Sequence, residues 1–321
     1  MPCYHPQLAV RMPGKTQSGK HPLKFIGKAS SYWNSSRRAP THALLLPCRQ
    51  CIGCRLEKSR QWATRLLHEI PYHDNACFLT LTYDDKHLPE NQSLIKADLQ
   101  TFFKNLRRRM DYYGKQKIKY FACGEYGDQT GRPHYHAALF GPFGCHTDDD
   151  GRELQEPSRS GDLQFTHDDI SSVWPYGLHR FSELTFESAA YVARYVLKKV
   201  SGNAQEAHYG DRAPEFQTSS NGLGKSHLLG TPQAPELGWL RDVYPSDHVV
   251  LPGRGEFLPP PYYDRLLEKT DPALYESVKK ARAEAHEKMT SSEWFEHVNR
   301  RLREGDVKKL VTEQTLIRGV L

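Results

Sequence analysis

The sequence lacks any long apolar run. Hydrophobic residues make up 38% of its 321 residues and charged residues 26%, and no stretch approaches the roughly 20 apolar residues that a membrane-spanning helix needs. The first residues, Met1 to Pro6, also lack the charged and then apolar order of a signal peptide. We therefore expect a globular protein with no membrane partner that stays in the cytoplasm where it is made.

A complete phosphate-binding loop is missing as well. Residues 222–226 end like one, but the first glycine of that motif would fall at position 219, which is Ser219. No clear strand pattern precedes the segment either, and the motif requires one. We expect no ATPase activity.

Disulfides are not expected in spite of seven cysteines, because cytosolic thiols are kept reduced. The net charge of +6 weakly favours an anionic partner. Many of the basic residues gather near one another in the chain, namely Arg49, Arg55, Lys58, Arg60, Arg65, Lys104, Arg107, Arg108 and Arg109. Charge alone leaves two interpretations open, a nucleic-acid surface or the solvated faces of helices.

Hydrophobic periodicity predicts strands over residues 76–82, 117–123 and 134–140. It predicts helices over 56–70, from a cap at Ser93 through Leu106, and over 186–200. We expect residues 1–47 and 141–162 to be irregular, and helical patterning returns between 264 and 310. This order indicates an α+β fold in which helices pack on one face of an antiparallel sheet.

The chain divides by composition into three parts. Residues 1–55 form an N-terminal arm with a cysteine cluster, and 56–205 form the expected catalytic domain. Residues 206–321 form a C-terminal region with an irregular segment and basic helices. Two roles are open for residues 251–321. They bind DNA or a partner, or their charges only keep a helix soluble.

His134 and His136 are the first residues that indicate chemistry. Residues two apart on a strand point to the same face, so these imidazoles lie side by side while Tyr135 points away. Two imidazoles on one face can bind a metal. The alternative is a pair of structural histidines.

Glu125 precedes His134 by nine residues across a glycine-rich connection. If that connection is tight, the carboxylate lies beside the histidines. A carboxylate with two imidazoles would leave metal positions for water and a phosphate oxygen, as Lewis-acid catalysis on a phosphodiester requires. The alternative is a surface glutamate in a Gly-Glu-Tyr-Gly turn.

The segment Tyr191-x3-Tyr195-x2-Lys198 adds a nucleophile. On a helix these three residues fall within an arc of about 60°. The small apolar residues lie on the opposite side: Ala189, Ala193, Val196 and Val200. A phenol with a pKa near 10 is a poor nucleophile at neutral pH. A nearby cation stabilises the phenolate, and a metal that polarises the phosphate makes a weaker nucleophile sufficient. Two tyrosines one turn apart would allow two consecutive transfers.

Together, Phe78-Leu-Thr-Leu-Thr82, His134-x-His136 and the tyrosine segment resemble the three ordered motifs of the HUH rolling-circle replication initiators. The two-tyrosine version is characteristic of small single-stranded DNA bacteriophages. Three wider stretches are similar to the replication initiators of gokushovirus-type microviruses: residues 48–63, 124–136 and 185–195. The similarity extends over about residues 45–250, including 242–247.

The resemblance implies a ferredoxin-like, RRM-like endonuclease core with the histidine strand near the middle of its sheet. It implies that Mg²⁺ or Mn²⁺ is held by His134 and His136, with Glu125 in the position of the acidic third ligand. It further implies a nick at origin DNA, a covalent 5′-phosphotyrosyl intermediate and religation that releases circles.

The same resemblance suggests roles for the helix. The Tyr-x-x-Lys spacing is shared with single-tyrosine relatives, so Tyr195 is interpreted as the first nucleophile, Tyr191 as the second and Lys198 as the cation that assists both. The implied partners are single-stranded origin DNA, a separate host helicase and the host replication machinery, in the cytoplasm of a bacterial host cell.

Cys48, Cys51 and Cys54 stand at two-residue gaps. Three thiolates, completed by Cys3 or His5, would make a tetrahedral zinc site that fastens the arm to the core. Unligated reduced thiols and an iron–sulfur cluster are the alternatives.

Two other functions remain open. A metal-dependent nuclease without a covalent intermediate would use the histidines and leave the tyrosines structural. A DNA-binding protein without enzymatic activity would bind in a strongly salt-dependent way and cleave with no divalent metal.

Overall fold

The computed structural model describes residues 3–17, 19, 21–29, 31, 43–115, 117–127, 130–145, 151–158, 161–198, 204–231, 238, 249–251 and 255–287. The chain divides into two compact units, whose described parts lie within residues 3–58 and 59–287. Each unit is described by itself. The boundaries at 55/56 and 205/206 stay predictions.

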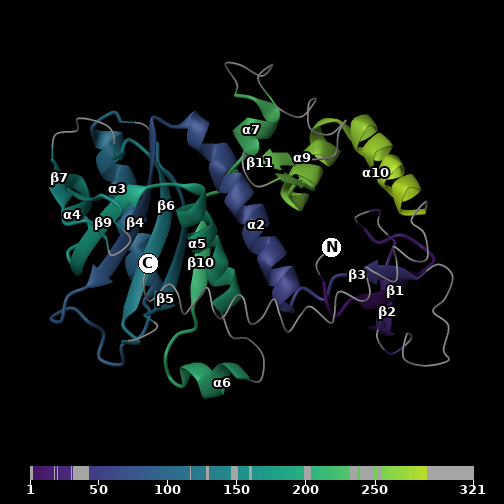
Figure 1. Ribbon diagram of the computed structural model, residues 1–321, viewed down its shortest axis with the longest axis horizontal. Helices are drawn as coiled ribbons and strands as arrows, with labels where there is room; N and C mark the ends of the chain where they lie inside the picture. The colour runs from purple at the N-terminus through teal and green to yellow at the C-terminus, as the bar shows by residue number, and fades with distance from the viewer. Residues whose placement is uncertain are drawn as a thin grey trace. The chain divides into compact units, whose positions relative to one another are not determined.

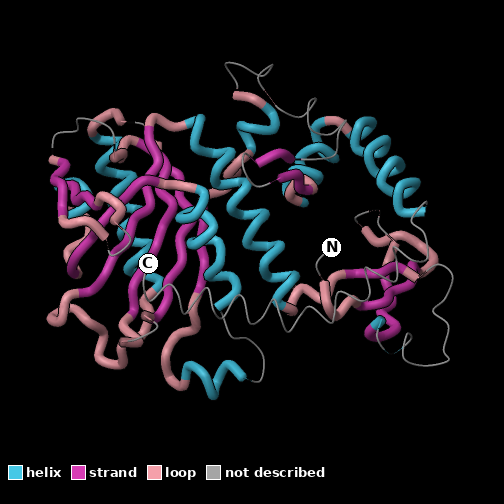
Figure 2. The backbone as a smooth tube through the Cα atoms, viewed as in Figure 1, coloured by secondary structure: helices cyan, strands magenta, loops and turns pink. Residues whose placement is uncertain are grey.

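The larger unit contains a seven-stranded sheet in the order β10-β5-β6-β4-β9-β8-β7 (Figures 1 and 2). All neighbouring strands are antiparallel. The strands are β4 (Asn75–Tyr83), β5 (Lys119–Tyr126), β6 (Pro133–Gly141), β7 (Arg152–Gln155), β8 (Gln164–His167), β9 (Gly177–Glu183) and β10 (Phe216–Ser219). The prediction of an α+β fold with an antiparallel sheet is confirmed.

The main helices around this sheet are α2 (Ile52–Glu69), α3 (Lys96–Tyr112) and α5 (Phe186–Lys198). Shorter elements are the 3-10 helix η1 (Ile70–Tyr72), α4 (Asp168–Ser171), α6 (Ala204–Tyr209) and α7 (Lys225–Leu229). The hairpin β11 (Val249–Leu251) and β12 (Gly255–Phe257) precedes α9 (Pro261–Thr270) and α10 (Pro272–Glu287). Among the helices described, none combines the length and apolarity that crossing a membrane demands.

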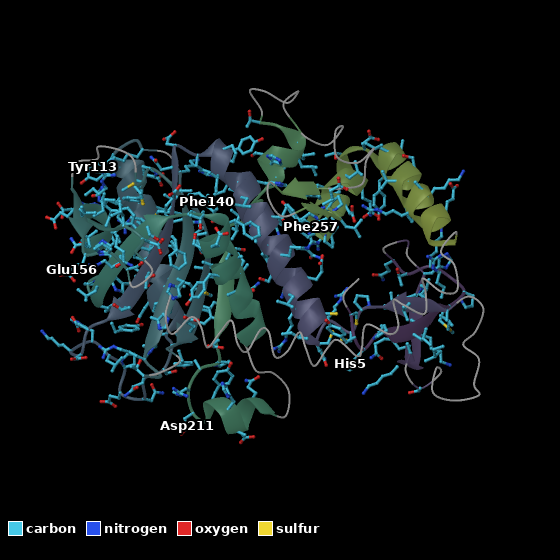
Figure 3. The ribbon with its side chains drawn as sticks, in the orientation of Figure 1. His5, Tyr113, Phe140, Glu156, Asp211 and Phe257 are labelled. Carbon is cyan, nitrogen blue, oxygen red and sulfur yellow. The ribbon has the colours of Figure 1, made fainter. Side chains whose placement is uncertain are left out.

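The expectation that helices cover one face of the sheet is wrong. On one face α3 packs Leu99, Phe102 and Phe103 against strand residues such as Leu79 and Leu139. On the other face Leu66 of α2 and Ala189 and Val192 of α5 join a second cluster with Phe121, Ala138 and Phe140. Of these residues, Figure 3 labels Phe140. The run Ala137-Ala-Leu-Phe140 has no polar residue in alternation, and a strand of that kind is buried on both faces.

Strand β6, which carries both histidines, lies in the interior of the sheet between β5 and β4. Strands β4 and β5 are connected through α3 and separated by β6, so they form a split β-α-β unit. The prediction that the histidine strand lies near the middle of the sheet is confirmed. Both of its edges are hydrogen-bonded to neighbouring strands, which holds its register.

The N-terminal residues are not an irregular arm. They form a three-stranded antiparallel sheet in the order β2-β1-β3, from β1 (Gln7–Arg11), β2 (Leu23–Lys28) and β3 (Leu44–Leu46). Within the segment 141–162, where a loop was expected, β7 adds an edge strand. Strands of three to six residues are too short to show a period in the sequence.

Ser93 does not cap α3. The cap position is Ile95, with no side-chain hydrogen bond, and the Ser93 hydroxyl instead accepts the Ala213 N–H at 2.8 Å. The hydroxyl of Tyr135 contacts the backbone of Ile95 twice, accepting from its N–H and donating to its carbonyl, both at 2.9 Å. The start of α3 is therefore held by the sheet and not by a local cap.

His179 of β9 makes the stability of this unit depend on pH. Its Nε2 accepts the backbone N–H of His167 at 3.0 Å, and burial, reinforced by the charges of Arg180 and His167, lowers its pKa to about 4. Unfolded histidine has a pKa of about 6.5, so between these values the unfolded chain binds the extra proton. The free energy of unfolding should fall as pH drops from about 6.5 to 4, by up to about 1.4 kcal/mol per unit from this group.

Urea unfolding of His179→Gln at pH 7, 6 and 5 checks this expectation, because glutamine keeps an acceptor but does not titrate. Its stability should depend less steeply on pH than that of the wild type. The exposed His208 supplies the control His208→Gln, which should keep the wild-type slope. An unchanged slope in His179→Gln would contradict the assignment.

Candidate metal centre and active site

The cross-strand register assembles the candidate site. Residue Glu125 of β5 is paired with His134 of β6, and Thr80 of β4 is paired with His136. Paired residues of antiparallel strands point to the same face, so all four side chains project together. Glu125 lies within the strand and not in a turn, since β5 continues to Tyr126.

The three expected ligands are in direct contact. One carboxylate oxygen of Glu125 lies 2.7 Å from Nε2 of His134 and 3.3 Å from Nε2 of His136. The exposed fraction of the side chain is 3% for Glu125, 9% for His136 and 17% for His134. The group is therefore largely buried, and His134 is the most exposed of the three side chains.

The second nitrogen of each ring is engaged as well. Nδ1 of His134 lies 3.1 Å from the carbonyl of Arg132, and because a carbonyl only accepts, Nδ1 carries the proton. Nδ1 of His136 lies 2.9 Å from the Thr80 hydroxyl. In the neutral ring of His134 the Nε2 lone pair then faces the carboxylate oxygen, so a proton or a cation is needed between them.

The electrostatics of Glu125 agree with a cation site. Burial raises the pKa of this carboxyl, but hydrogen bonds from His134 and His136, together with their charge, outweigh burial and bring the pKa to about 2. The group is therefore a carboxylate at every pH at which the protein would work. An ionised, buried carboxylate is a strong ligand for a divalent cation.

The donor set fits a divalent metal. Ligands at about 2.1 Å and at right angles lie about 3.0 Å apart, and the two oxygen–nitrogen distances of 2.7 and 3.3 Å bracket that value. The ligand atoms of Glu125, His134 and His136 are all within 4.8 Å of one another. These residues would hold the ion by one oxygen and two nitrogens.

Tyr191 of α5 stands beside this group. Its ring centroid lies 5.4 Å from that of His136 and 5.9 Å from that of Phe78, both edge-on. The residue is half-buried and packs against the apolar cluster on this face, although we expected it to lie clear of the apolar stripe. Its ring therefore packs directly beside one of the candidate metal ligands, His136.

Tyr195 and Lys198 belong to α5, but their side chains lie outside the described residues. The backbone of the helix continues without interruption to Lys198. On that helix Tyr195 follows Tyr191 by one turn, as the sequence predicts.

Thr80 and Phe78 are site residues whose roles the sequence did not reveal. Thr80 contacts the ring nitrogen of His136, and the ring of Phe78 stacks on His136 with centroids 5.2 Å apart. Both alternate along β4 on the face of the histidines. The motif at residues 78–82 drew attention to this segment, but the contacts of Phe78 and Thr80 with His136 depend on the pairing of β4 with β6, which periodicity alone does not predict.

The segment 222–226 needs one correction. A strand, β10, does precede it, but β10 is an antiparallel edge strand beside β5. The N–H of Gly224, which a phosphate would require, donates to the buried carboxylate of Glu69 at 2.6 Å. This N–H is therefore engaged by an anion of the protein itself, and the expectation of no ATPase activity stays a prediction.

The cysteines also gather. The sulfur atoms of Cys3, Cys48, Cys51 and Cys54 lie within 4.8 Å of one another. Of the two candidates for a fourth member, Cys3 joins the group and His5 does not. All four residues belong to the N-terminal unit.

The sequence is similar to known replication-associated proteins. The profile of the family described as replication-associated protein ORF2/G2P matches residues 76–200, a range that includes β4, β5, β6 and α5. The chain is 34% identical to the replication-associated protein ORF2 of Spiroplasma virus 4 over 235 residues, which are 70% of this chain and 68% of that protein.

Two more relatives have a similar sequence identity to this chain. The replication-associated protein VP4 of Bdellovibrio phage phiMH2K is 34% identical over 231 residues, 70% of this chain and 68% of that protein. The replication-associated protein ORF4 of Chlamydia phage 1 is 33% identical over 231 residues, 70% of this chain and 54% of that protein. No solved structure matches the chain.

Thr80 provides a test of the metal centre that leaves the ligands in place. Thr80→Val keeps the shape of the side chain but removes the contact with Nδ1 of His136. Loss of a side chain that hydrogen-bonds to a metal ligand lowers metal affinity roughly 10- to 100-fold. Titration with Mn²⁺ should show a decrease of this size in Thr80→Val.

The matched control is Thr82→Val on the same face of β4. Thr82 is paired with His134, but its hydroxyl donates to the Leu178 carbonyl at 3.3 Å and contacts neither ring. This variant should bind Mn²⁺ as the wild type does. Equal affinities of the two variants would show that the Thr80 contact does not orient a ligand.

Proposed function

The chain belongs to the replication-associated proteins of the ORF2/G2P family, with relatives in microviruses, and from this premise we propose that it initiates phage DNA replication by nicking single-stranded origin DNA. The nucleophile is a tyrosine of α5, and the metal centre is Glu125, His134 and His136. The ion is Mg²⁺ or Mn²⁺.

The observation that supports this proposal most is the position of Tyr191 beside the metal ligands. The phenol, the two imidazoles and the carboxylate come from α5, β6 and β5 and meet on one face of the sheet. A phosphodiester bound there would contact a nucleophile and a cation at once. That combination is what transfer of a phosphoryl group to a tyrosine requires.

The proposed nick is a transesterification. The phenol oxygen attacks the phosphorus, a bond forms between tyrosine and the 5′ phosphate, and the bond to the 3′ oxygen breaks. The phenol proton is lost and the departing 3′ oxygen gains one, so the strand ends as a 3′ hydroxyl. A bound divalent ion supplies Lewis-acid stabilisation of the charge on the phosphate.

The reverse reaction closes a circle. A free 3′ hydroxyl attacks the phosphotyrosine, the phosphodiester forms again and the phenol is released. One phosphate ester is exchanged for another, so no ATP is needed. We propose that Tyr195 makes the first cut, that Tyr191 attacks the regenerated origin and that Lys198 steadies the phenolate or the phosphate in both steps.

The partners follow from the chemistry. The proposed substrate is single-stranded origin DNA, and the proposed partners are a separate host helicase and the host replication machinery, which open and copy the duplex. The place of action is the cytoplasm of the bacterial host cell.

A second candidate function is a metal-dependent nuclease that forms no covalent intermediate. It is favoured by the packing of Tyr191 against Phe78 and His136, which a purely structural tyrosine would also make. A labelled origin oligonucleotide separates the two functions. A protein–DNA adduct that survives denaturation supports the tyrosine mechanism, and cleavage without an adduct supports the second candidate.

The metal ligands give the first functional test. His134→Ala and His136→Ala should abolish cleavage of origin DNA and leave its binding largely intact, because phosphate contacts depend mainly on lysine and arginine. Glu125→Gln should weaken cleavage and change the preference between Mg²⁺ and Mn²⁺. Nicking and filter-binding assays at matched salt measure both effects. Cleavage at the wild-type rate by His134→Ala would overturn the assignment.

The two tyrosines give the second test. Tyr195→Phe should lose most initial nicking, and Tyr191→Phe should nick but fail to release successive circles. The double variant should form no adduct. Gel analysis of labelled origin DNA after one and several rounds of synthesis distinguishes these steps.

The order of the tyrosines is open to direct contradiction. Loss of the first nick in Tyr191→Phe would reverse the order and agree with the position of its ring beside His136. Equal nicking by both single variants would show that the tyrosines are interchangeable. An adduct in the double variant would exclude the tyrosine mechanism altogether.

A further inference from the structure

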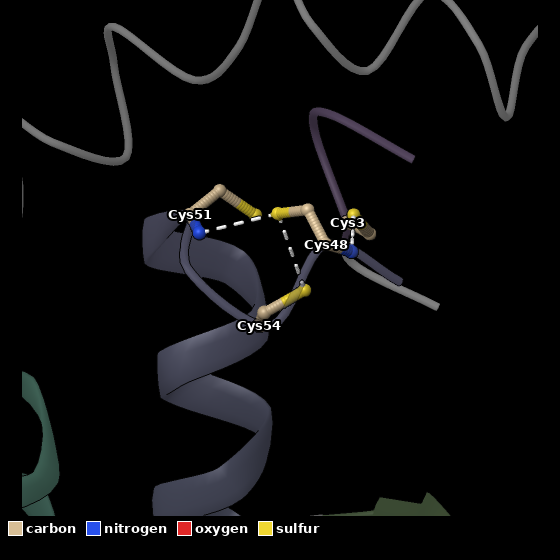
Figure 4. A group of neighbouring side chains, drawn as sticks. All are labelled: Cys3, Cys48, Cys51 and Cys54. Atoms are coloured by element: carbon tan, nitrogen blue, oxygen red, sulfur yellow. Dashed lines mark hydrogen bonds between the residues drawn. The ribbon is translucent and has the colours of Figure 1, made fainter. Parts of the chain in front are cut away.

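Four thiols meet at the first turn of α2, away from the Glu125 centre in sequence (Figure 4). The sulfur atoms of Cys48 and Cys54 lie 4.0 Å apart, and all four are within 4.8 Å of one another. Four sulfurs that surround one zinc ion tetrahedrally, each at about 2.3 Å, lie about 3.8 Å apart. The cluster needs only a small contraction to reach that geometry.

The backbone around the cluster presents N–H groups to the sulfurs. Sγ of Cys3 accepts from the N–H of Cys48 at 3.2 Å, and Sγ of Cys48 accepts from the N–H of Cys51 at 3.3 Å. Sγ of Cys51 accepts from the N–H of Tyr4 at 3.4 Å. A hydrogen bond to a charged acceptor is stronger than one to a neutral acceptor, so these N–H groups would stabilise the thiolate form of the cysteines that a bound metal requires.

The positions of the cysteines in the chain indicate that the cluster stabilises the N-terminal sheet. Cys3 precedes β1 and Cys48 follows β3, so the cluster closes a loop that contains all three strands of the small sheet. In the described part of this unit the buried apolar residues are few: Tyr4, Leu8, Ala9, Ala29 and Cys51. Small domains with few buried apolar residues commonly add a metal or disulfides.

We propose that Cys3, Cys48, Cys51 and Cys54 hold one structural zinc ion that fastens the N-terminal sheet to the start of α2. Thiolates are soft ligands that select zinc or iron over Mg²⁺ and Mn²⁺. Four protein ligands leave no position for a substrate, which is typical of a structural and not a catalytic zinc. The site is independent of the proposed nicking reaction.

The test uses the full-length protein, purified under reducing conditions without added metal. Elemental analysis should find about one zinc per chain in the wild type. Replacement of zinc by Co²⁺ should give the tetrahedral d–d bands and the sulfur-to-cobalt charge-transfer band of a tetrathiolate site. The spectrum identifies cysteine ligands in the wild type itself, so it remains decisive where a cysteine variant does not fold.

Two variants locate the ion. Cys51→Ser should lower the zinc content at least 10-fold, and limited proteolysis should then cut residues 3–47 faster than the larger unit. Cys145→Ser is the matched control, because Cys145 is a half-buried thiol outside the cluster and should leave zinc unchanged. His134→Ala should also retain full zinc, which separates this site from the Glu125 centre.

Several results would overturn the proposal. These are less than 0.1 zinc per chain in freshly reduced wild type, iron in place of zinc, a cobalt spectrum without sulfur charge transfer, or loss of zinc in His134→Ala. Failure of origin nicking with zinc retained would count against the proposed function alone. Loss of zinc from Cys51→Ser with nicking preserved would support the structural role.

Discussion

The pairing of β6 with both of its neighbours is the interaction on which the site depends. Glu125 and Thr80 reach the histidines only because β5 and β4 are paired with β6 in one particular register. A slip of β6 by one residue would turn both histidines to the face opposite Glu125 and Thr80. The geometry of the candidate metal centre is thus a property of the sheet, and each imidazole ring has a second contact, to Arg132 or to Thr80.

Tyr135, between the two histidines, shows how that register is secured. Its side chain points to the opposite face and is 1% exposed. Its hydroxyl contacts Tyr83 at 2.8 Å as well as the backbone of Ile95, so β6 is linked to β4 and to the start of α3. Along β6, the two histidines of the candidate site point to one face, and Tyr135 between them points to the other, where it links the strand to β4 and α3.

The sequence predicted the elements of the core because their apolar patterns are long. Residues 76–82 and 134–140 are strands within one residue of the expected bounds, and His134 and His136 share a face as the period of two requires. The helices themselves were predicted, but that they cover both faces of the sheet was missed, although Ala137-Ala-Leu-Phe140 carries that information in its lack of alternation. The small N-terminal sheet was missed because its strands are too short to show a period.

The contacts of single side chains could not be predicted in the same way. The role of Thr80 depends on a pairing between residues 56 apart in sequence, and the failure of Ser93 as a cap depends on Ala213. The choice of Cys3 over His5 is of the same kind, since both lie near the start of the chain and only the folded sheet distinguishes them. Local patterns constrain local structure, whereas these contacts are set by tertiary packing.

The burial of β5 and β6 on both faces has a consequence for how the protein comes apart. Backbone amides in such strands exchange with solvent only when the whole sheet opens, whereas edge strands and loops open locally at lower cost. Most residues of β6 are buried, so we expect the amides of His134, His136 and Glu125 to be among the slowest to exchange. The three candidate ligands should therefore keep their arrangement during local fluctuations, and a metal ion that bound there would meet a site already assembled, with little ordering left to oppose it.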